Sequence, residues 1–181
     1  RLGLPVPPGF TITTDVCDLF YKNKKKLPNK VIQNIELELK NIEKKTKKKF
    51  GDLKNPLLVS VRSGARISMP GMMDTILNLG LNDKTVESLK KKTSNGRFAK
   101  DSYRRFIQMY SNVVLGVEGH LFEELIENYK LTKGVLLDTD LDESDWDGLI
   151  TNFKDLVKKE KKINFPQDVC LLYTSDAADD P

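Results

Sequence analysis

Residues 56–75 read PLLVSVRSGARISMPGMMDT and are expected to form the centre of the fold. The run from Leu57 to Val61 is apolar except for Ser60 and includes two β-branched valines, which is typical of a buried strand. The strand delivers Arg62 to its end, and a loop with two glycines, one proline and three methionines follows at once. Residues 76–81 are expected to return as a second short strand. The centre of the fold is therefore predicted to be β-structure with a loop at its end.

The sequence before this centre predicts two helices. Three prolines in residues 4–9 disfavour a helix there, and the alternation of residues 10–13 favours a short strand. Thr14 is expected to cap a helix that begins directly after it. The apolar face of that helix would consist of Cys17, Phe20 and Tyr21. A longer helix is expected over residues 28–48, where apolar residues recur at helical spacing.

The sequence after the centre predicts four amphipathic helices, of which Asn82/Asp83 and Asp142 are expected to cap the first and the last. Their apolar stripes are Val86 and Leu89; Phe98, Tyr103, Phe106, Ile107, Tyr110, Val113 and Val114; Leu121, Phe122, Leu125, Ile126 and Tyr129; and Trp146, Leu149, Ile150, Phe153, Leu156 and Val157. Such stripes are expected to pack against one another as a small bundle. The predicted fold class is α+β, with a mixed α/β part over residues 1–81 followed by an all-α part over residues 82–167.

Composition and charge limit the classes of function. No apolar run approaches the roughly 20 residues that span a bilayer, so no membrane role is expected. The net charge is +4, and residues 22–49 carry eleven lysines against three glutamates. These lysines share a helix with an apolar stripe and have no interleaved aromatic residues, so we interpret them as a solvated face rather than a nucleic-acid surface. Cys17 and Cys170 are far apart and are read as free thiols of a cytoplasmic protein.

The loop that follows Arg62 has the residue types of an anion site. Arg62 and Arg66 carry permanently charged, planar forks that can chelate phosphate oxygens. Glycines such as Gly71 allow a close approach of the backbone to a ligand. Asp74 and Thr75 could orient the loop or contact hydrated Mg²⁺. The loop matches neither a P-loop nor G-x-G-x-x-G, and the residues alone leave open that Arg62 is a structural ion-pair partner.

Four segments of the sequence resemble the N-terminal domain of the pyruvate phosphate dikinase family. The resemblance is carried by PLLVSVRSGARISMPGMMDTILNLGLND over residues 56–83 and by RFAKDSYRRFIQMY over residues 97–110. LPVPPGFTITT at residues 4–14 and FPQ at residues 165–167 fit the same family in the same order. The resemblance covers about residues 2–168.

This resemblance implies an activity and a domain plan. The family converts ATP, phosphate and pyruvate into AMP, diphosphate and phosphoenolpyruvate through a phosphohistidine. Its N-terminal domain is of the ATP-grasp type, phosphorylates a histidine on a swivelling domain, and uses Mg²⁺. A TIM-barrel domain then phosphorylates pyruvate. The resemblance implies a parent that is a homo-oligomer, a partial ATP-grasp subdomain over residues 1–81 and a helical insertion over residues 82–167.

The resemblance also implies the site residues. Arg62 stands at the position of the family's arginine that binds the ATP phosphates, and Arg66, Gly71, Asp74 and Thr75 are secondary candidates. The phospho-accepting histidine motif has no counterpart here, and His120 is interpreted as a surface or capping residue.

The chain is expected to be a fragment that is inactive in isolation. It begins with arginine rather than methionine, and the family's glycine-rich segment and acidic Mg²⁺ ligands are expected outside it. Residues 168–181 depart from the family and are interpreted as a non-native, disordered tail.

Two alternatives remain open at this point. One is a phosphoenolpyruvate synthase-type dikinase that uses water in place of phosphate, although residues 64–66 and 70–73 favour the phosphate-using family. The other is a non-enzymatic basic binding module built on residues 22–49. The sequence also does not decide whether Arg104 and Arg105 pair with nearby acids or with a neighbouring domain.

Overall fold

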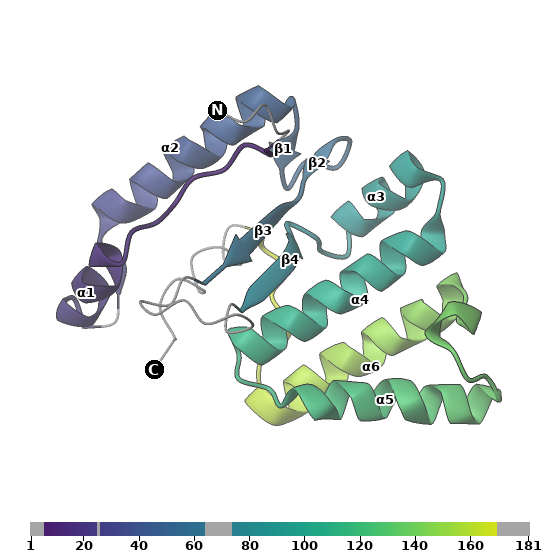
Figure 1. The fold of residues 1–181 in the computed structure, drawn as a ribbon. Helices are drawn as coiled ribbons and strands as arrows, with labels where there is room; N and C mark the ends of the chain where they lie inside the picture. Colours follow the sequence, from purple (N-terminus) through teal and green to yellow (C-terminus); the bar gives the residue numbers. More distant parts are fainter. Residues whose placement is uncertain (1–5, 25, 64–73, 170–181) are drawn as a thin grey trace.

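The computed structural model describes residues 6–24, 26–63 and 74–169 of the chain. Its elements are the helices α1 (Asp15–Lys22), α2 (Asn29–Thr46), α3 (Thr85–Thr93), α4 (Gly96–Val113), α5 (Gly119–Lys133) and α6 (Glu143–Lys161), the 3-10 turn η1 (Asp138–Asp140), and the strands β1 (Lys49–Phe50), β2 (Pro56–Leu57), β3 (Val59–Arg62) and β4 (Thr75–Leu79). Helices with a few short strands confirm the predicted α+β class. Figure 1 shows α1 and α2 on one side of the strands and α3 to α6 on the other.

The strands form two small sheets. β1 and β2 are parallel, while β3 and β4 are antiparallel, with Val61 opposite Ile76 and Arg62 opposite Thr75. The return strand was predicted over residues 76–81 and is found at β4. The preceding strand differs from the prediction, because it is interrupted at Leu58 and β3 is only half-buried. Within the described parts of the chain, β3 pairs only with β4. One face of this pair packs on the body of the protein, while Ser60 and Arg62 on the other face of β3 are exposed.

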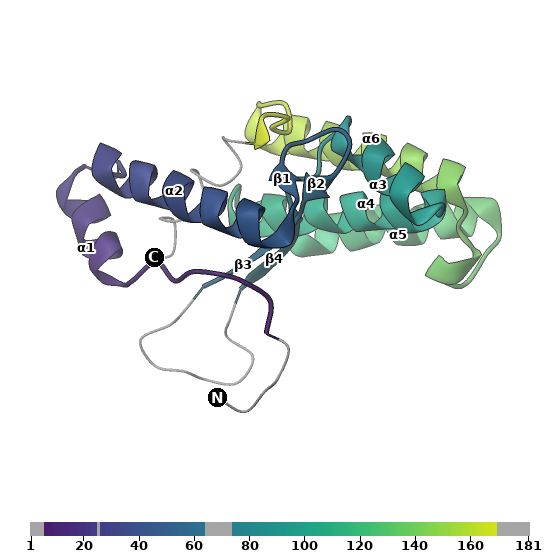
Figure 2. The same cartoon turned by 90° about the horizontal axis from the view of Figure 1, so that it is seen from above.

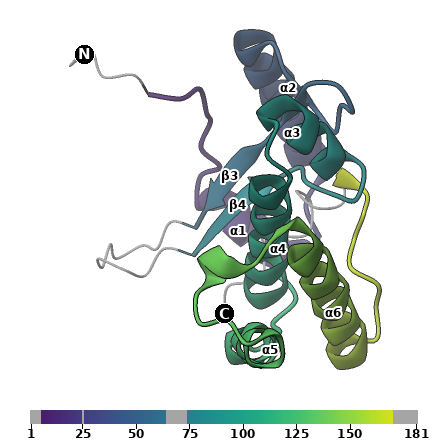
Figure 3. The same cartoon turned by 90° about the vertical axis from the view of Figure 1, so that its right-hand side faces the viewer.

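Helix α4 is the centre of the core. It packs against α3, α6 and β4, and Figure 3 shows it between the β3–β4 hairpin and α6. The side chains of Tyr103, Phe106, Tyr110 and Trp146 are all fully buried, as predicted. Phe122 and Phe153 join α5 to α6 with ring centroids 4.8 Å apart.

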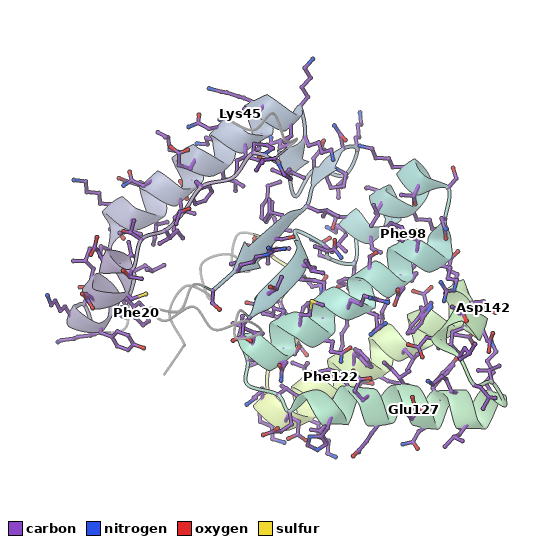
Figure 4. The ribbon with its side chains drawn as sticks, viewed as in Figure 1. Phe20, Lys45, Phe98, Phe122, Glu127 and Asp142 are labelled. Carbon is purple, nitrogen blue, oxygen red and sulfur yellow. The ribbon has the colours of Figure 1, made fainter. Side chains whose placement is uncertain are left out.

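The apolar stripe predicted for α4 is wrong at Phe98, which is 49% exposed. Phe98 lies in the first turn of the helix, near the outer end of the bundle, where neighbouring helices leave it uncovered (Figure 4). Asn95 caps this turn by accepting a hydrogen bond from the Phe98 amide at 2.9 Å. A residue in a terminal turn can fit the helical period and still lie beyond the packed part of the helix.

The helix caps are partly as predicted. Asp142 caps α6 and accepts from the Asp145 amide at 3.0 Å, while the Asp145 carboxylate accepts from the Asp142 amide at 2.7 Å. Asn82 accepts from the amides of Lys84 and Thr85 at the start of α3. Thr14 occupies the capping position of α1, but its side chain forms no cap hydrogen bond.

Helices α1 and α2 lie outside the main core. Figure 2 shows them at the end of the molecule away from α3 to α6. Their buried side chains, Phe20, Ile35 and Ile42, do not belong to the large buried cluster. Cys17 and Tyr21, predicted to share the inner face of α1, are exposed. The predicted strand at residues 10–13 is also wrong, because this segment has no strand structure.

The segment after α6 returns across the helical part. The ring of Phe165 is buried against Phe106 and Tyr110, with centroid separations of 5.9 and 5.7 Å. Val169 packs against the core cluster. Residues 170–181 of the predicted tail lie outside the described residues, so the prediction of disorder stays a prediction. The boundary at residue 81 also stays a prediction, and the buried cluster contains side chains from both sides of it.

The surface features fit the interpretation of α2 as a solvated basic helix. Its lysines, such as Lys45, project outward in Figure 4, whereas Ile35 and Ile42 are buried. None of the helices in the described parts of the chain combines the length and apolar character that crossing a bilayer requires.

Candidate functional site

The β3–β4 hairpin places Arg62 on its open face. Side chains alternate across a sheet, so directly opposed residues share a face. Val61 and Ile76 form the face that packs on the body, and Ile76 is 2% exposed. The next pair, Arg62 and Thr75, therefore projects from the opposite face. Arg62 is exposed and Thr75 is half-buried.

Arg62 has no ion-pair or hydrogen-bond partner among the residues that the structure describes. The described residues therefore provide no acidic partner for the alternative in which Arg62 forms a structural ion pair. An exposed guanidinium at a strand end is available to an anionic ligand, and its planar fork suits phosphate oxygens.

A pair of hydrogen bonds closes the hairpin directly after Arg62. The Ser63 amide donates to the Asp74 carbonyl at 3.0 Å, and the Asp74 amide donates to the Ser63 hydroxyl at 3.1 Å. Asp74 is exposed and directly precedes Thr75, so both residues lie at the same end of the hairpin as Arg62, although the alternation of side chains places Thr75, and not Asp74, on the face of Arg62. Arg66 and Gly71, the other predicted site residues, lie outside the described residues.

The described residues supply little of a metal site. Within residues 6–24, 26–63 and 74–169, no group of three or more His, Cys, Asp or Glu side chains is arranged so that it could hold a metal ion. Asp74 offers a single carboxylate at the end of the hairpin. Mg²⁺ in phosphate-transfer sites is commonly held by one or two carboxylates together with the substrate's phosphates. Asp74 could therefore supply one ligand of such a site, and the other ligands would have to come from elsewhere.

A second polar cluster joins the turn before α3, helices α4 and α6, and the returning C-terminal segment. The Tyr103 hydroxyl donates to Asp83 at 3.0 Å and accepts from the Gln167 side chain at 3.1 Å. The Asp83 amide donates to the Gln167 side chain at 3.0 Å, and Lys154 pairs with Asp83. Burial raises the pKa of Tyr103 far above its ordinary value. Sequence reasoning assigned Tyr103 to the core but missed these partners, which come from distant parts of the chain.

A buried lysine joins helices α3, α4 and α6. Lys100 donates to Glu87 at 2.7 Å and lies 2.8 Å from Asp147. Burial alone would lower the pKa of Lys100, but its bonds to Asp147 and Glu87 raise it above 10.5. Every polar contact of Lys100 is thus made within the bundle, which indicates a structural role.

The two arginines left open by the sequence both pair with an acid on their own helix. Asp101 accepts from Arg104 at 2.6 Å and from Arg105 at 3.1 Å. Arg104 is buried and its guanidinium carbon lies 4.7 Å from the centre of the Trp146 ring. His120 is exposed, with Nδ1 3.9 Å from a Glu118 carboxylate oxygen, in keeping with its interpretation as a surface residue.

Comparison with known proteins agrees with the resemblance in the sequence. A model of the family described as pyruvate phosphate dikinase, AMP/ATP-binding domain, matches residues 24–117, which is about half of the chain and includes β3, β4 and Arg62. The chain is 52% identical over 168 residues to pyruvate, phosphate dikinase of Clostridium symbiosum and 50% identical over 168 residues to that of Entamoeba histolytica. It is 50% identical over 167 residues to the chloroplastic enzyme of Flaveria pringlei.

These matches cover nearly all of the chain and a small part of each relative. They span 92–93% of this chain, but only 17–19% of the length of the relatives. The chain thus corresponds to about a fifth of a dikinase of this type. The match to the domain model extends across the β3–β4 hairpin and α4, the elements that form the candidate site and the centre of the core. The chain therefore belongs to the family of the pyruvate phosphate dikinase AMP/ATP-binding domain.

Proposed function

We propose that this chain is part of the ATP site of a pyruvate phosphate dikinase, and that Arg62 binds the phosphates of the nucleotide. The parent protein would convert ATP, phosphate and pyruvate into AMP, diphosphate and phosphoenolpyruvate through a phosphohistidine. The observation that carries the proposal is the exposed Arg62 at the end of β3, without a partner among the described residues, inside the segment matched by the AMP/ATP-binding domain.

The proposed chemistry of Arg62 follows from its charge and shape. Transfer of a phosphoryl group spreads negative charge over the phosphate oxygens, and a fixed cation lowers the energy of that state. A guanidinium can contact two oxygens at once and stays charged at every physiological pH. The hairpin holds Arg62 directly opposite Thr75, with Asp74 as the preceding residue of the chain. We propose Thr75 as a further contact to the phosphates and Asp74 as a contact to a Mg²⁺ ion bound with them.

The remaining parts of the proposal concern the parent protein. They comprise an ATP-grasp fold completed outside this chain, a swivelling phosphohistidine domain, a TIM-barrel domain and a homo-oligomeric state. A cytoplasmic location is also proposed. The alternative is a chloroplast, because the relative from Flaveria pringlei is named as chloroplastic. The chain alone is expected to show no turnover, because it contains only part of the proposed site.

The test replaces Arg62 in the full-length parent and measures the two half-reactions separately. Arg62→Ala is expected to lower ATP-dependent phosphorylation of the enzyme by at least about a hundredfold, a typical effect of removing a group that stabilises transition-state charge. Exchange of label between pyruvate and phosphoenolpyruvate should stay within about twofold, because it does not use the nucleotide. Ser60→Ala is the matched control, since Ser60 is exposed on the same strand two residues earlier.

An equal loss of both half-reactions in Arg62→Ala would contradict the assigned role. Full ATP-dependent phosphorylation by the same variant would contradict it as well. The choice of acceptor is tested separately by omitting phosphate from the wild-type assay. The proposal predicts no AMP formation coupled to pyruvate without phosphate, whereas undiminished turnover would point to a water-using dikinase.

A further inference from the structure

The β3–β4 ladder ends in an unusual pair of hydrogen bonds. In an antiparallel sheet, the two residues of a hydrogen-bonded pair exchange both of their backbone N–H···O=C bonds. Ser63 and Asp74 are the next pair after Arg62 and Thr75 in the register of the hairpin. The Ser63 amide makes the expected bond to the Asp74 carbonyl, but the Asp74 amide donates to the Ser63 hydroxyl.

The hydroxyl of Ser63 thus takes the place of a backbone acceptor. The last amide of a ladder has no further backbone acceptor on the opposite strand, so a side chain or water must accept its hydrogen bond. When a side chain supplies that acceptor, the backbone carbonyl is released from the ladder and the chain can leave the sheet at that residue. Serine hydroxyls commonly substitute for backbone groups in this way at the ends of regular structure. The Ser63 hydroxyl therefore fixes where β3 ends.

The position of that end bears directly on the proposed site. Arg62 is the last residue of β3, and its opposite neighbour Thr75 is the first residue of β4. Because hydrogen-bonded and non-bonded pairs alternate, the Arg62–Thr75 pair belongs to the closely spaced, non-bonded type. The Ser63–Asp74 pair follows the Arg62–Thr75 pair toward the end of the ladder, and the Val61–Ile76 pair precedes it. Both neighbouring pairs restrict the position of Arg62 relative to Thr75.

We infer that Ser63 is a positioning residue for the ATP half-reaction, acting through its hydrogen bond to the Asp74 amide to hold Arg62 and Thr75 in register. The inference rests on the proposed function of Arg62. Ser63 itself is assigned no contact with the nucleotide. Its hydroxyl sets the point at which the backbone departs from the sheet, and so the direction in which the adjacent guanidinium is presented.

The two simplest substitutions separate this role from others. Ser63→Ala removes the acceptor, so the Asp74 amide either loses its partner or pairs with the backbone of residue 63 and shifts the end of the ladder. Ser63→Thr keeps a hydroxyl on the same carbon, and threonine suits a strand. A role of the hydroxyl therefore predicts loss with alanine and recovery with threonine, while a role of side-chain size predicts the reverse.

The experiment measures kcat/KM for ATP in phosphorylation of the full-length parent. Ser63→Ala is expected to lower it by about fivefold or more, the consequence of leaving a hydrogen-bonding group unpaired. The kcat/KM of Ser63→Thr is expected to lie within about twofold of the wild-type value, because the threonine hydroxyl keeps the hydrogen bond. The pyruvate–phosphoenolpyruvate exchange and its KM for phosphoenolpyruvate serve as readouts that the inference predicts to be unchanged in both variants.

Hydrogen exchange of the Asp74 amide supplies an independent readout. The inference predicts faster exchange at Asp74 in Ser63→Ala than in wild type or Ser63→Thr, with no change at Leu79 at the far end of β4. Wild-type kinetics for Ser63→Ala, or no recovery by threonine, would overturn the inference. If Arg62→Ala still removes phosphorylation in that case, only the role of Ser63 fails, whereas an inert Arg62→Ala shows that the proposed function itself has failed.

Discussion

Two arginines of this chain show how context decides the use of the same side chain. Arg104 is buried, bonds to Asp101 and Gln108, and stacks on Trp146. Its charge is therefore engaged within the helical bundle. Arg62 is exposed at a strand end and has no partner among the described residues. The Arg62 guanidinium is therefore available to an anionic ligand, and that of Arg104 is not.

Glycine at position 80 is predicted to be essential for the packing of the strands. Its φ is +110°, and a Cβ there would lie 2.9 Å from the Leu57 carbonyl oxygen and 2.9 Å from a ring carbon of Phe50. Gly80→Ala is expected to lower the free energy of unfolding by about 2–4 kcal/mol, because backbone strain and steric overlap add. Chemical denaturation of the chain measures the effect.

Gly134 provides the matched control for that substitution. It also has a positive φ of +74°, but no atom lies within 4 Å of the position of its added Cβ. Gly134→Ala should therefore show the backbone cost alone, about 1 kcal/mol. Equal losses for the two variants would contradict the assigned close approach at Gly80.

Among the helices and strands, the sequence predicts well those features that depend only on residues close together in the chain. The cap of α6 at Asp142 was predictable because its hydrogen bonds connect residues three positions apart. The strand expected at residues 10–13 was wrong, because alternation describes one strand and a strand also needs a partner that the sequence pattern does not reveal. The half-exposed state of β3 escaped prediction for the same reason, since it depends on β3 having a single neighbour.

The ion pairs between helices predict how stability depends on pH. The hydrogen bond from Lys100 holds the pKa of Glu87 below its ordinary value of 4.5. A carboxylate whose pKa is lower in the folded state stabilises that state at pH values above its pKa in the unfolded chain. This contribution is lost as the pH falls through the pKa of the folded state. The free energy of unfolding is therefore expected to decline as pH falls below 4.5, measured by urea denaturation across pH.

The matched variants for this prediction are Glu87→Gln and Glu124→Gln. Glu87→Gln should flatten part of the acid-side decline, because it removes one of the groups that titrate. Glu124 is exposed on α5, so Glu124→Gln should leave the decline unchanged. An acid profile that is the same in all three proteins would argue against the stabilising role of the Glu87–Lys100 pair.

At the scale of the whole molecule, one large buried cluster runs from β4 through α3 to α6 and ends at Phe165. Helices α1 and α2 stand outside this cluster (Figure 1). Local stability follows the number of buried apolar contacts that hold a segment in place. We therefore expect the backbone amides of α4 and α6 to exchange slowest with solvent and those of α1 to exchange fastest.

Hydrogen exchange followed by mass spectrometry on the 181-residue chain tests this order. Peptides from α4 and α6 should be protected by a factor approaching that of global unfolding, and peptides from α1 by much less. Protection of α1 equal to that of α4 would mean that the first helices belong to the same cooperative unit. The same measurement shows whether the segment around Phe165 is protected together with α4.

The candidate site was predictable in part. The strand ending in Arg62, with a glycine-bearing loop after it, indicated an anion site from residue types alone, and the family resemblance gave it a ligand. The opposition of Arg62 and Thr75 and the bond between Ser63 and Asp74 were not predictable, because they depend on the register between two strands. The partners of Tyr103 escaped for a similar reason, since Gln167 lies 64 residues away along the chain.

Binding of a nucleotide's phosphates by the Arg62 guanidinium can be observed directly. The most direct test is a crystal structure of the full-length parent with a non-hydrolysable ATP analogue and Mg²⁺. We expect a guanidinium nitrogen of Arg62 within about 3 Å of a phosphate oxygen, the distance of a charge-assisted hydrogen bond. A bound nucleotide whose phosphates lie away from the open face of the β3–β4 hairpin, with Arg62 turned toward another protein group, would contradict it.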